Sequence, residues 1–202
     1  MKSALIIAVV QNDFYPGGAL GVPKANQINE VINSLMEKNE FDKIVATQDW
    51  HPVGHESFAS THDKEPFSPY SAPGIGPVLW PDHCVQNSKG AEFHSDINTE
   101  KFDLIVRKGY SKKIDSYSVF KENDGTELGL SGYFEALDIN KLYVVGLALD
   151  YCVKFTAEDA VKKSFDTTII KSGSRAIEQD KDKLNDILKR MKDKNIKIIE
   201  NF

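Results

Sequence analysis

Short apolar runs recur along this chain and alternate with segments of helical period. The runs that predict strands lie at residues 4–10, 43–47, 103–107, 142–147, 167–171 and 196–199. Several are continuously apolar, as expected of strands that helices cover on both faces. Between the first two runs, one helix face is formed by Ile28, Val31, Ile32, Leu35 and Met36, and residues 184–191 repeat the pattern. The alternation predicts an α/β fold: an open, mostly parallel six-stranded sheet with helices on both faces, in three α/β/α layers.

The composition is that of an ordinary globular protein, and it limits the classes of binding partner that we expect. At 202 residues, the chain is expected to form a single domain over residues 1–202. Charged residues make up 27% of it, and the net charge of −5 argues against a nucleic acid or an anionic membrane as partner. Two cysteines are too few for a disulfide scaffold, so we expect a reducing, cytoplasmic location. The amino-terminal apolar run is short and lacks a small-residue cleavage site, which favours a buried strand over a signal peptide.

Cys152 follows the apolar run at 142–147 and precedes a helix-like segment at 152–160. A thiol at the carboxyl end of a strand and the amino end of a helix lies near unpaired backbone N–H groups and the helix dipole. Both favour a thiolate, and the N–H groups can also bind an oxyanion. The position therefore suits a cysteine nucleophile. The alternative is a small buried thiol in a strand-to-helix turn.

Other polar side chains follow neighbouring strands, at the sheet edge where ligands bind in open α/β folds. Asp49, His51 and His55 follow the second run, Lys108 follows the third, and His83 lies in the long segment 51–90. That segment is rich in His, Pro, Ser and Gly, and a loop of its length is typical of a functional site. Carboxylate and imidazole ligands suit Zn²⁺, Mn²⁺ or Fe²⁺. Solvated loop histidines and an ordinary surface lysine are the alternatives.

Aromatic residues near these positions also have two interpretations. Phe14, Trp80 and Tyr117 either pack in the core and loops or form a flat wall for an aromatic ligand. The sequence alone leaves both open.

Together these motifs resemble the nicotinamidase/pyrazinamidase branch of the isochorismatase-like cysteine hydrolases. The matching segments run in order over nearly the whole chain: Gln11-Asn12-Asp13-Phe14, Ala46-Thr47-Gln48-Asp49-Trp50-His51-Pro52, Trp80-Pro81-Asp82-His83-Cys84-Val85, Lys108-Gly109 and Val145-Gly146-Leu147-Ala148-Leu149-Asp150-Tyr151-Cys152-Val153. The Asp-x-His motif together with Trp-Pro-x-His-Cys indicates nicotinamidases rather than isochorismatases.

The resemblance implies a role for each site residue. Cys152 would be the nucleophile and Lys108 its charged neighbour. The implied ligands of one divalent metal, foremost zinc, with manganese or iron as alternatives, are Asp49, His51 and His83, with His55 at a variable or water-mediated position. The implied oxyanion hole is formed by the amides of Ala148 and Cys152, with a cis peptide between Ala148 and Leu149. Phe14 and Trp80 would flank a pyridine ring whose nitrogen faces the metal.

Position 9 departs from this pattern. Family members carry an aspartate two residues before the Gln of Q-N-D-F, as the general base of an Asp-Lys-Cys triad, whereas this chain has Val9. Leu149 is a milder departure, since Thr or Ser is usual there. Without the carboxylate we expect Lys108 to lack a fixed partner, so that either Lys108 loses its proton or Cys152 ionises. The expected result is a weakened amidase that still binds ligand and metal.

The sequence thus leaves three hypotheses. The first is a nicotinamidase of NAD salvage that acts on nicotinamide, and on pyrazinamide as a surrogate, through a cysteine thioester. The second is a hydrolase of the same superfamily that acts on another small amide. The third is a catalytically silent protein that binds nicotinamide. A homo-oligomer is compatible with all three.

Overall fold

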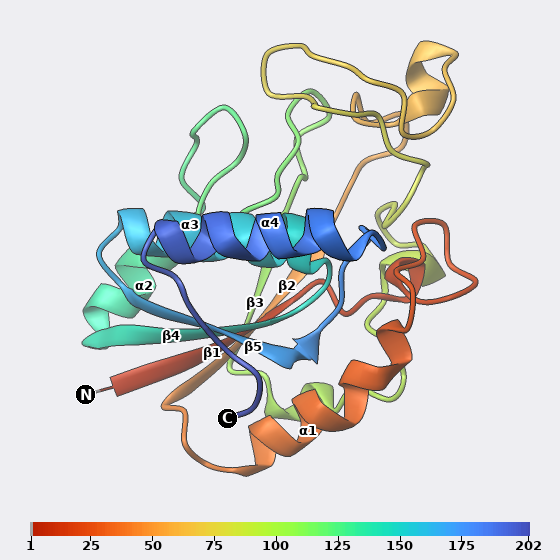
Figure 1. The fold of residues 1–202 in the computed structure, drawn as a ribbon. Helices are drawn as coiled ribbons and strands as arrows, with labels where there is room; N and C mark the ends of the chain where they lie inside the picture. The colour runs from red at the N-terminus through yellow and green to blue at the C-terminus, as the bar shows by residue number, and fades with distance from the viewer. Residues whose placement is uncertain (1) are drawn as a thin grey trace.

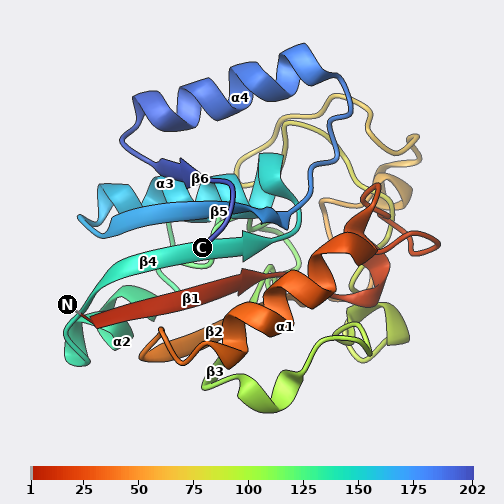
Figure 2. The same cartoon turned by 60° about the horizontal axis from the view of Figure 1, so that its bottom comes forward.

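The computed structural model describes residues 2–202 and is built on one six-stranded sheet. The strands are β1 (Lys2–Ala8), β2 (Lys43–Asp49), β3 (Leu104–Lys108), β4 (Ile139–Gly146), β5 (Asp166–Ser174) and β6 (Lys197–Ile199). Their order is β3-β2-β1-β4-β5-β6, and every neighbouring pair is parallel (Figure 2). All six predicted strands are therefore confirmed, although β4 begins three residues before the apolar run.

Helices lie on both faces of the sheet, as predicted. They are α1 (Asn29–Glu37), α2 (Leu130–Ala136), α3 (Lys154–Lys162) and α4 (Lys181–Asp193). In Figure 1, α1 lies below the sheet, and α3 and α4 lie above it. Asp180 starts α4 by accepting hydrogen bonds from the backbone N–H groups of Asp182 and Lys183, and basic residues follow in the last turn. None of the helices in residues 2–202 has the length and apolar character that crossing a membrane requires.

The carboxyl ends of the central strands carry the polar side chains that the sequence singled out. β1 is buried almost throughout, since parallel strands at the centre of a sheet are covered on both faces. Asp49 ends β2 and is the register partner of Lys108, which ends β3. Cys152 follows β4 in a single π-helical turn, Leu149–Val153, just before α3. The long segment 51–90 extends from this edge at the top right of Figure 1; the buried residues lie toward its two ends, and residues 60–74 are exposed or half-buried.

Candidate active site

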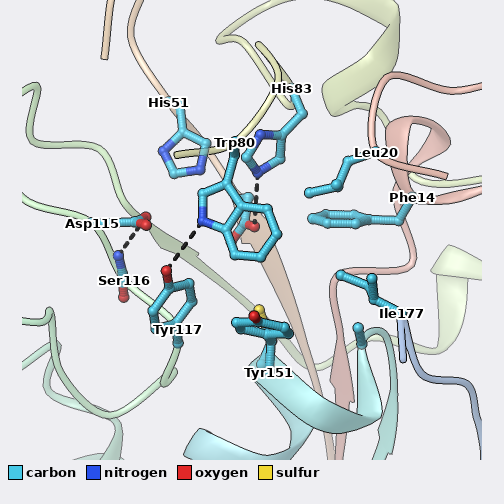
Figure 3. A pocket seen from close by; sticks show the side chains of 13 residues that line it. Phe14, Leu20, His51, Trp80, His83, Asp115, Ser116, Tyr117, Tyr151 and Ile177 are labelled. Atoms are coloured by element: carbon cyan, nitrogen blue, oxygen red, sulfur yellow. Dashed lines mark hydrogen bonds and ion pairs between the residues drawn. The ribbon is translucent and has the colours of Figure 1, made fainter. Parts of the chain in front are cut away.

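A cavity lies at the carboxyl ends of β1, β2 and β4. Residues of the long segment 51–90, among them Trp80 and His83, form part of its wall. Its lining consists of Phe14, Leu20, Asp49, His51, Trp80, His83, Asp115, Ser116, Tyr117, Ala148, Tyr151, Cys152 and Ile177. Figure 3 shows Phe14, Leu20 and Ile177 on one side, Asp115 and Tyr117 on the other, and His51 and His83 above Tyr151. Apolar and aromatic walls with a few convergent polar groups are typical of a small-molecule site.

Lys108 connects the carboxylate of the site to its thiol. Its Nζ donates hydrogen bonds to Asp49 Oδ1 and to the Ser116 carbonyl at 2.7 Å, and it lies 3.4 Å from Cys152 Sγ. The side chain of Lys108 is completely buried. The prediction that Lys108 lacks a fixed partner is therefore wrong, because Asp49 pairs with it. The register of β2 and β3 brings the two side chains together, and the pattern of apolar runs does not reveal this register.

The protonation states also differ from both expected outcomes. Burial alone would lower the pKa of Lys108, but the negative charge of Asp49 and its hydrogen bond raise the pKa above its ordinary value. Burial raises the pKa of Cys152 to about 12, although the nearby Lys108 ammonium acts in the opposite direction. At neutral pH the structure thus holds a charged lysine and a neutral thiol. The predicted thiolate at the helix terminus is wrong, because burial of the sulfur outweighs the favourable charges.

Asp49, His51 and His83 form a group that fits a divalent metal. The ligand atoms that they offer lie within 4.8 Å of one another, and all three side chains are buried. The Nδ1–H of His51 donates to the Gly109 carbonyl at 2.9 Å, and that of His83 donates to the Pro81 carbonyl at 2.8 Å. These bonds leave each Nε2 free to bind a metal, and His83 Nε2 lies 3.9 Å from Asp49 Oδ2.

The charge of His51 agrees with such a role. Burial, with the nearby His83, lowers the pKa of His51 well below its ordinary value, so the imidazole is neutral, as a metal ligand must be. One oxygen and two nitrogen ligands leave further coordination positions for water or substrate.

His55 packs against His51, with 4.4 Å between the ring centres, but it is not a member of the Asp49/His51/His83 group. Its Nδ1 accepts hydrogen bonds from the backbone N–H of Ser57 at 3.1 Å and from the Ser57 hydroxyl at 2.7 Å, and its Nε2 donates to the Ile114 carbonyl at 3.1 Å. His55 belongs instead to a second group with His51 and Asp115. Since both of its ring nitrogens already have partners, a direct role for His55 as a ligand stays a prediction.

The aromatic walls contain both residues that the resemblance implied. Phe14 and Trp80 are each less than 5% exposed and line the cavity. Trp80 Nε1 donates to the Tyr117 hydroxyl at 3.1 Å, which in turn donates to the Gly76 carbonyl at 2.9 Å. The sequence analysis assigned no role to five further lining residues, which are Leu20, Asp115, Ser116, Tyr151 and Ile177. Only Tyr151 carried a signal, because it directly precedes Cys152.

The backbone beside Cys152 differs in one detail from the prediction. The cis peptide lies between Leu147 and Ala148, one bond before the expected position. Ala148 lines the cavity, and its backbone N–H makes no backbone hydrogen bond within residues 2–202. The assignment of the Ala148 and Cys152 amides to an oxyanion hole stays a prediction.

Val9 lies at the carboxyl end of β1, between the ends of β2 and β4. It is fully buried, and its backbone N–H donates to Thr47 Oγ1 at 3.2 Å. Its φ angle is +38°, in a region that Asp, Asn and Gly enter far more easily than a β-branched residue does. The local backbone at this position thus fits an aspartate better than it fits the valine that is present.

Gly109 fixes the orientation of His51, which leads to the first prediction. A Cβ at position 109 would lie 2.5 Å from His51 Cε1, and its φ is +63°. We expect Gly109→Ala to weaken zinc binding by about 10- to 100-fold, because the displaced ring can no longer present Nε2. Competition with a chromogenic chelator would measure this. Gly54→Ala is the matched control, since Gly54 has φ +66° but contacts only the end of the Lys112 side chain at 3.5 Å.

The control should lower the free energy of unfolding by about 1–2 kcal/mol through backbone strain alone and leave zinc affinity unchanged. Unaltered zinc affinity in Gly109→Ala would contradict the proposed positioning of His51.

Comparison with known proteins places this site in a family. The family model described as the isochorismatase domain matches residues 3–200. A nicotinamidase of Acinetobacter baylyi is 47% identical over 177 residues, covering 87% of this chain and 82% of the relative. Among solved structures, a nicotinamidase/pyrazinamidase of Acinetobacter baumanii has a TM-score of 0.92 at 43% identity, covering 98% of this chain and 95% of that one.

A second solved structure bears on the metal. The pyrazinamidase of Pyrococcus horikoshii in complex with zinc has a TM-score of 0.82 at 33% identity, and the match covers all of both chains. The family match over nearly the whole sequence agrees with the sheet order and with the residues gathered at its edge. This chain is a member of the isochorismatase domain family.

Proposed function

We propose that the chain hydrolyses nicotinamide to nicotinate and ammonia, with pyrazinamide as a surrogate substrate, and so serves NAD salvage. The observation that carries the proposal is the convergence of Cys152, Lys108 and the Asp49/His51/His83 group on one cavity with aromatic walls. The nicotinamidase relatives, at up to 47% identity, support the same substrate. Both cysteines are free, which supports a reducing compartment such as the cytoplasm.

The chemistry follows from the residues around the sulfur. Cys152 gives up its proton and its sulfur bonds to the carboxamide carbon, which releases ammonia and leaves a thioester. Lys108 keeps its charge beside the sulfur and stabilises the negative charge that develops there. Water then attacks the thioester, which releases nicotinate and restores the thiol. Phe14 and Trp80 hold the ring between them, and the Ala148 and Cys152 amides bind the carbonyl oxygen.

A divalent metal would be held by Asp49, His51 and His83, and we propose zinc. The mixed oxygen and nitrogen ligands suit it, and the Pyrococcus relative binds it. When bound, the metal would supply a Lewis acid that orients the substrate. Asp49 would then use Oδ2 toward the metal and Oδ1 toward Lys108.

We further propose that Val9 makes this enzyme slow. An apolar side chain can neither take the proton from Cys152 nor return one to the departing ammonia. Asp49 balances the charge of Lys108 with Oδ1, and its Oδ2 faces His83 in the proposed metal group. Val9 is also the one observation that favours a second candidate, a protein that binds nicotinamide without hydrolysing it.

Mass spectrometry of the intact protein after incubation with nicotinamide separates these candidates. We expect a nicotinoyl adduct on Cys152, slow release of ammonia, and about one divalent metal ion per chain by elemental analysis. The Cys152→Ala protein should bind nicotinamide but form no adduct. Binding by the unaltered protein without adduct or ammonia, at high protein concentration and long times, would reject hydrolysis and leave the silent binder.

A further inference from the structure

Apart from the cavity at Cys152, a polar groove lies on the outer surface between α3 and α4. Its lining is formed by Lys154, Phe155, Glu158, Ile187, Arg190 and Lys194, none of which lines the cavity at Cys152. The two helices lie on the same side of the sheet (Figures 1 and 2). Three cations and one carboxylate share this groove in a chain whose net charge is −5. The positive charge is therefore local and does not reflect a basic protein.

In the described part of the chain, one of the three cations forms an ion pair and the other two form none. Lys194 Nζ forms an ion pair with Glu158 Oε2 at 2.9 Å. Within residues 2–202, neither Lys154 nor Arg190 makes an ion pair or a side-chain hydrogen bond. Lys154 is half-buried, and its Nζ lies 4.3 Å from the centre of the Phe155 ring. The groove thus exposes two unpaired donors beside an aromatic ring.

Lys154 contributes a partly desolvated charge to the groove. It lies inside a continuous helical segment, because the π-helical turn Leu149–Val153 runs directly into α3. Burial lowers the pKa of Lys154, the negative charges of Glu158 and Asp150 oppose this, and the like charges of Lys194 and Arg190 lower the pKa further. Arg190 and Lys194 lie at the carboxyl end of α4, where cations are favourable. Desolvating a cation that has no ion-pair partner costs free energy, and a bound anion would offset this cost.

We propose that the α3–α4 groove binds a phosphate-bearing anion. The Arg190 guanidinium offers a planar pair of donors that matches a phosphate, and Lys154 and Lys194 add two further charges. Phe155 and Ile187 provide an apolar wall for an organic group attached to the phosphate. Free phosphate or pyrophosphate and the phosphates of a nucleotide share this chemistry, and the experiment distinguishes them.

The test is isothermal titration of the full-length protein with pyrophosphate and, separately, with ATP, at low and constant ionic strength. We expect both the Lys154→Gln/Arg190→Gln double variant and the single Arg190→Gln variant to bind at least about tenfold more weakly than the unaltered chain. The matched control is Lys189→Gln/Lys192→Gln, which removes two exposed charges from the same helix outside the groove. It should bind as the unaltered chain does.

Each result decides the proposal or identifies the anion. Affinity of ATP well above that of pyrophosphate assigns the groove to a nucleotide, and equal affinities assign it to free phosphate; both support the proposal. Equal affinity in the groove variants and the control places the anion elsewhere, such as at the metal ligands, and overturns it. Absence of binding at millimolar concentrations also overturns it. The single variant keeps the test valid if the double variant unfolds, because Arg190 is exposed on α4.

Discussion

Replacing Val9 with aspartate should raise kcat for nicotinamide hydrolysis by about 10² to 10⁴, the range that general acid–base catalysis typically contributes. The sheet order explains why position 9 can reach the thiol. Lys108 starts from β3, and its amine lies 3.4 Å from the sulfur that follows β4. Since β2 and β1 lie between β3 and β4, Val9 at the end of β1 lies on the same edge of the sheet, between the elements that carry the amine and the sulfur. A carboxylate there would stand beside both Lys108 and Cys152.

The backbone makes this substitution tolerable, which is unusual for a buried charge. At φ +38°, aspartate is under less strain than valine, so relief of strain should offset part of the desolvation of the carboxylate. Val9→Asn is the matched control, because it relieves the same strain and has the same shape without the charge. Steady-state ammonia release from the three proteins, at equal metal content, is the measurement. If the asparagine variant is as fast as the aspartate variant, strain and not the missing carboxylate limits the enzyme.

The sequence predicts the strands that position this site better than it predicts the burial and protonation of the side chains inside it. Runs such as 142–147 are apolar because both faces of a central parallel strand are covered, so the strands and the edge they define are recognisable. The seven-residue helix α2 was not predicted, since so short a segment shows little periodicity. Cys152 lies where expected, yet its neutral state depends on burial by the long loop and the walls of the cavity. No local pattern reveals such burial.

The contact between Lys108 and Asp49 illustrates the same limit. The two residues are 59 positions apart and meet through strand register, which depends on the packing of the whole sheet. The Gln11 side chain holds the backbone of Asp49 in place. Its Nε2 donates to the Asp49 carbonyl at 2.9 Å, and its Oε1 accepts from the Asp49 N–H at 2.7 Å. The family resemblance includes all three residues, but it led us to expect no fixed partner for Lys108 in this chain. Only the arrangement in space shows that Asp49, the proposed metal ligand, is also the counter-ion of Lys108.

Because Asp49 is both the proposed metal ligand and the counter-ion of Lys108, we expect substitutions at positions 49 and 9 to have coupled effects on the free energy of unfolding. Asp49→Asn should lower the free energy of unfolding by about 3–5 kcal/mol in metal-free protein, because it leaves the buried Lys108 ammonium without a carboxylate. In the Val9→Asp background the same substitution should cost about 1–3 kcal/mol less, since the new aspartate can pair with Lys108. Denaturant unfolding of the four proteins in the presence of a chelator completes the cycle and excludes any contribution from metal binding.

Zinc affinity in the same four proteins separates the two roles of the carboxylate. Asp49→Asn should lose most of its zinc affinity in both backgrounds, because an aspartate at position 9 lies one strand away from the His51/His83 pair and cannot replace Oδ2. Stability should therefore recover without metal binding. If the unfolding costs of the two substitutions simply add, residue 9 does not reach Lys108, and the proposal that Val9 slows hydrolysis fails as well. If the costs are coupled while zinc affinity stays low, the two oxygens of Asp49 serve two separate cations. Valine at position 9 then leaves Asp49 as the carboxylate that balances both Lys108 and the metal.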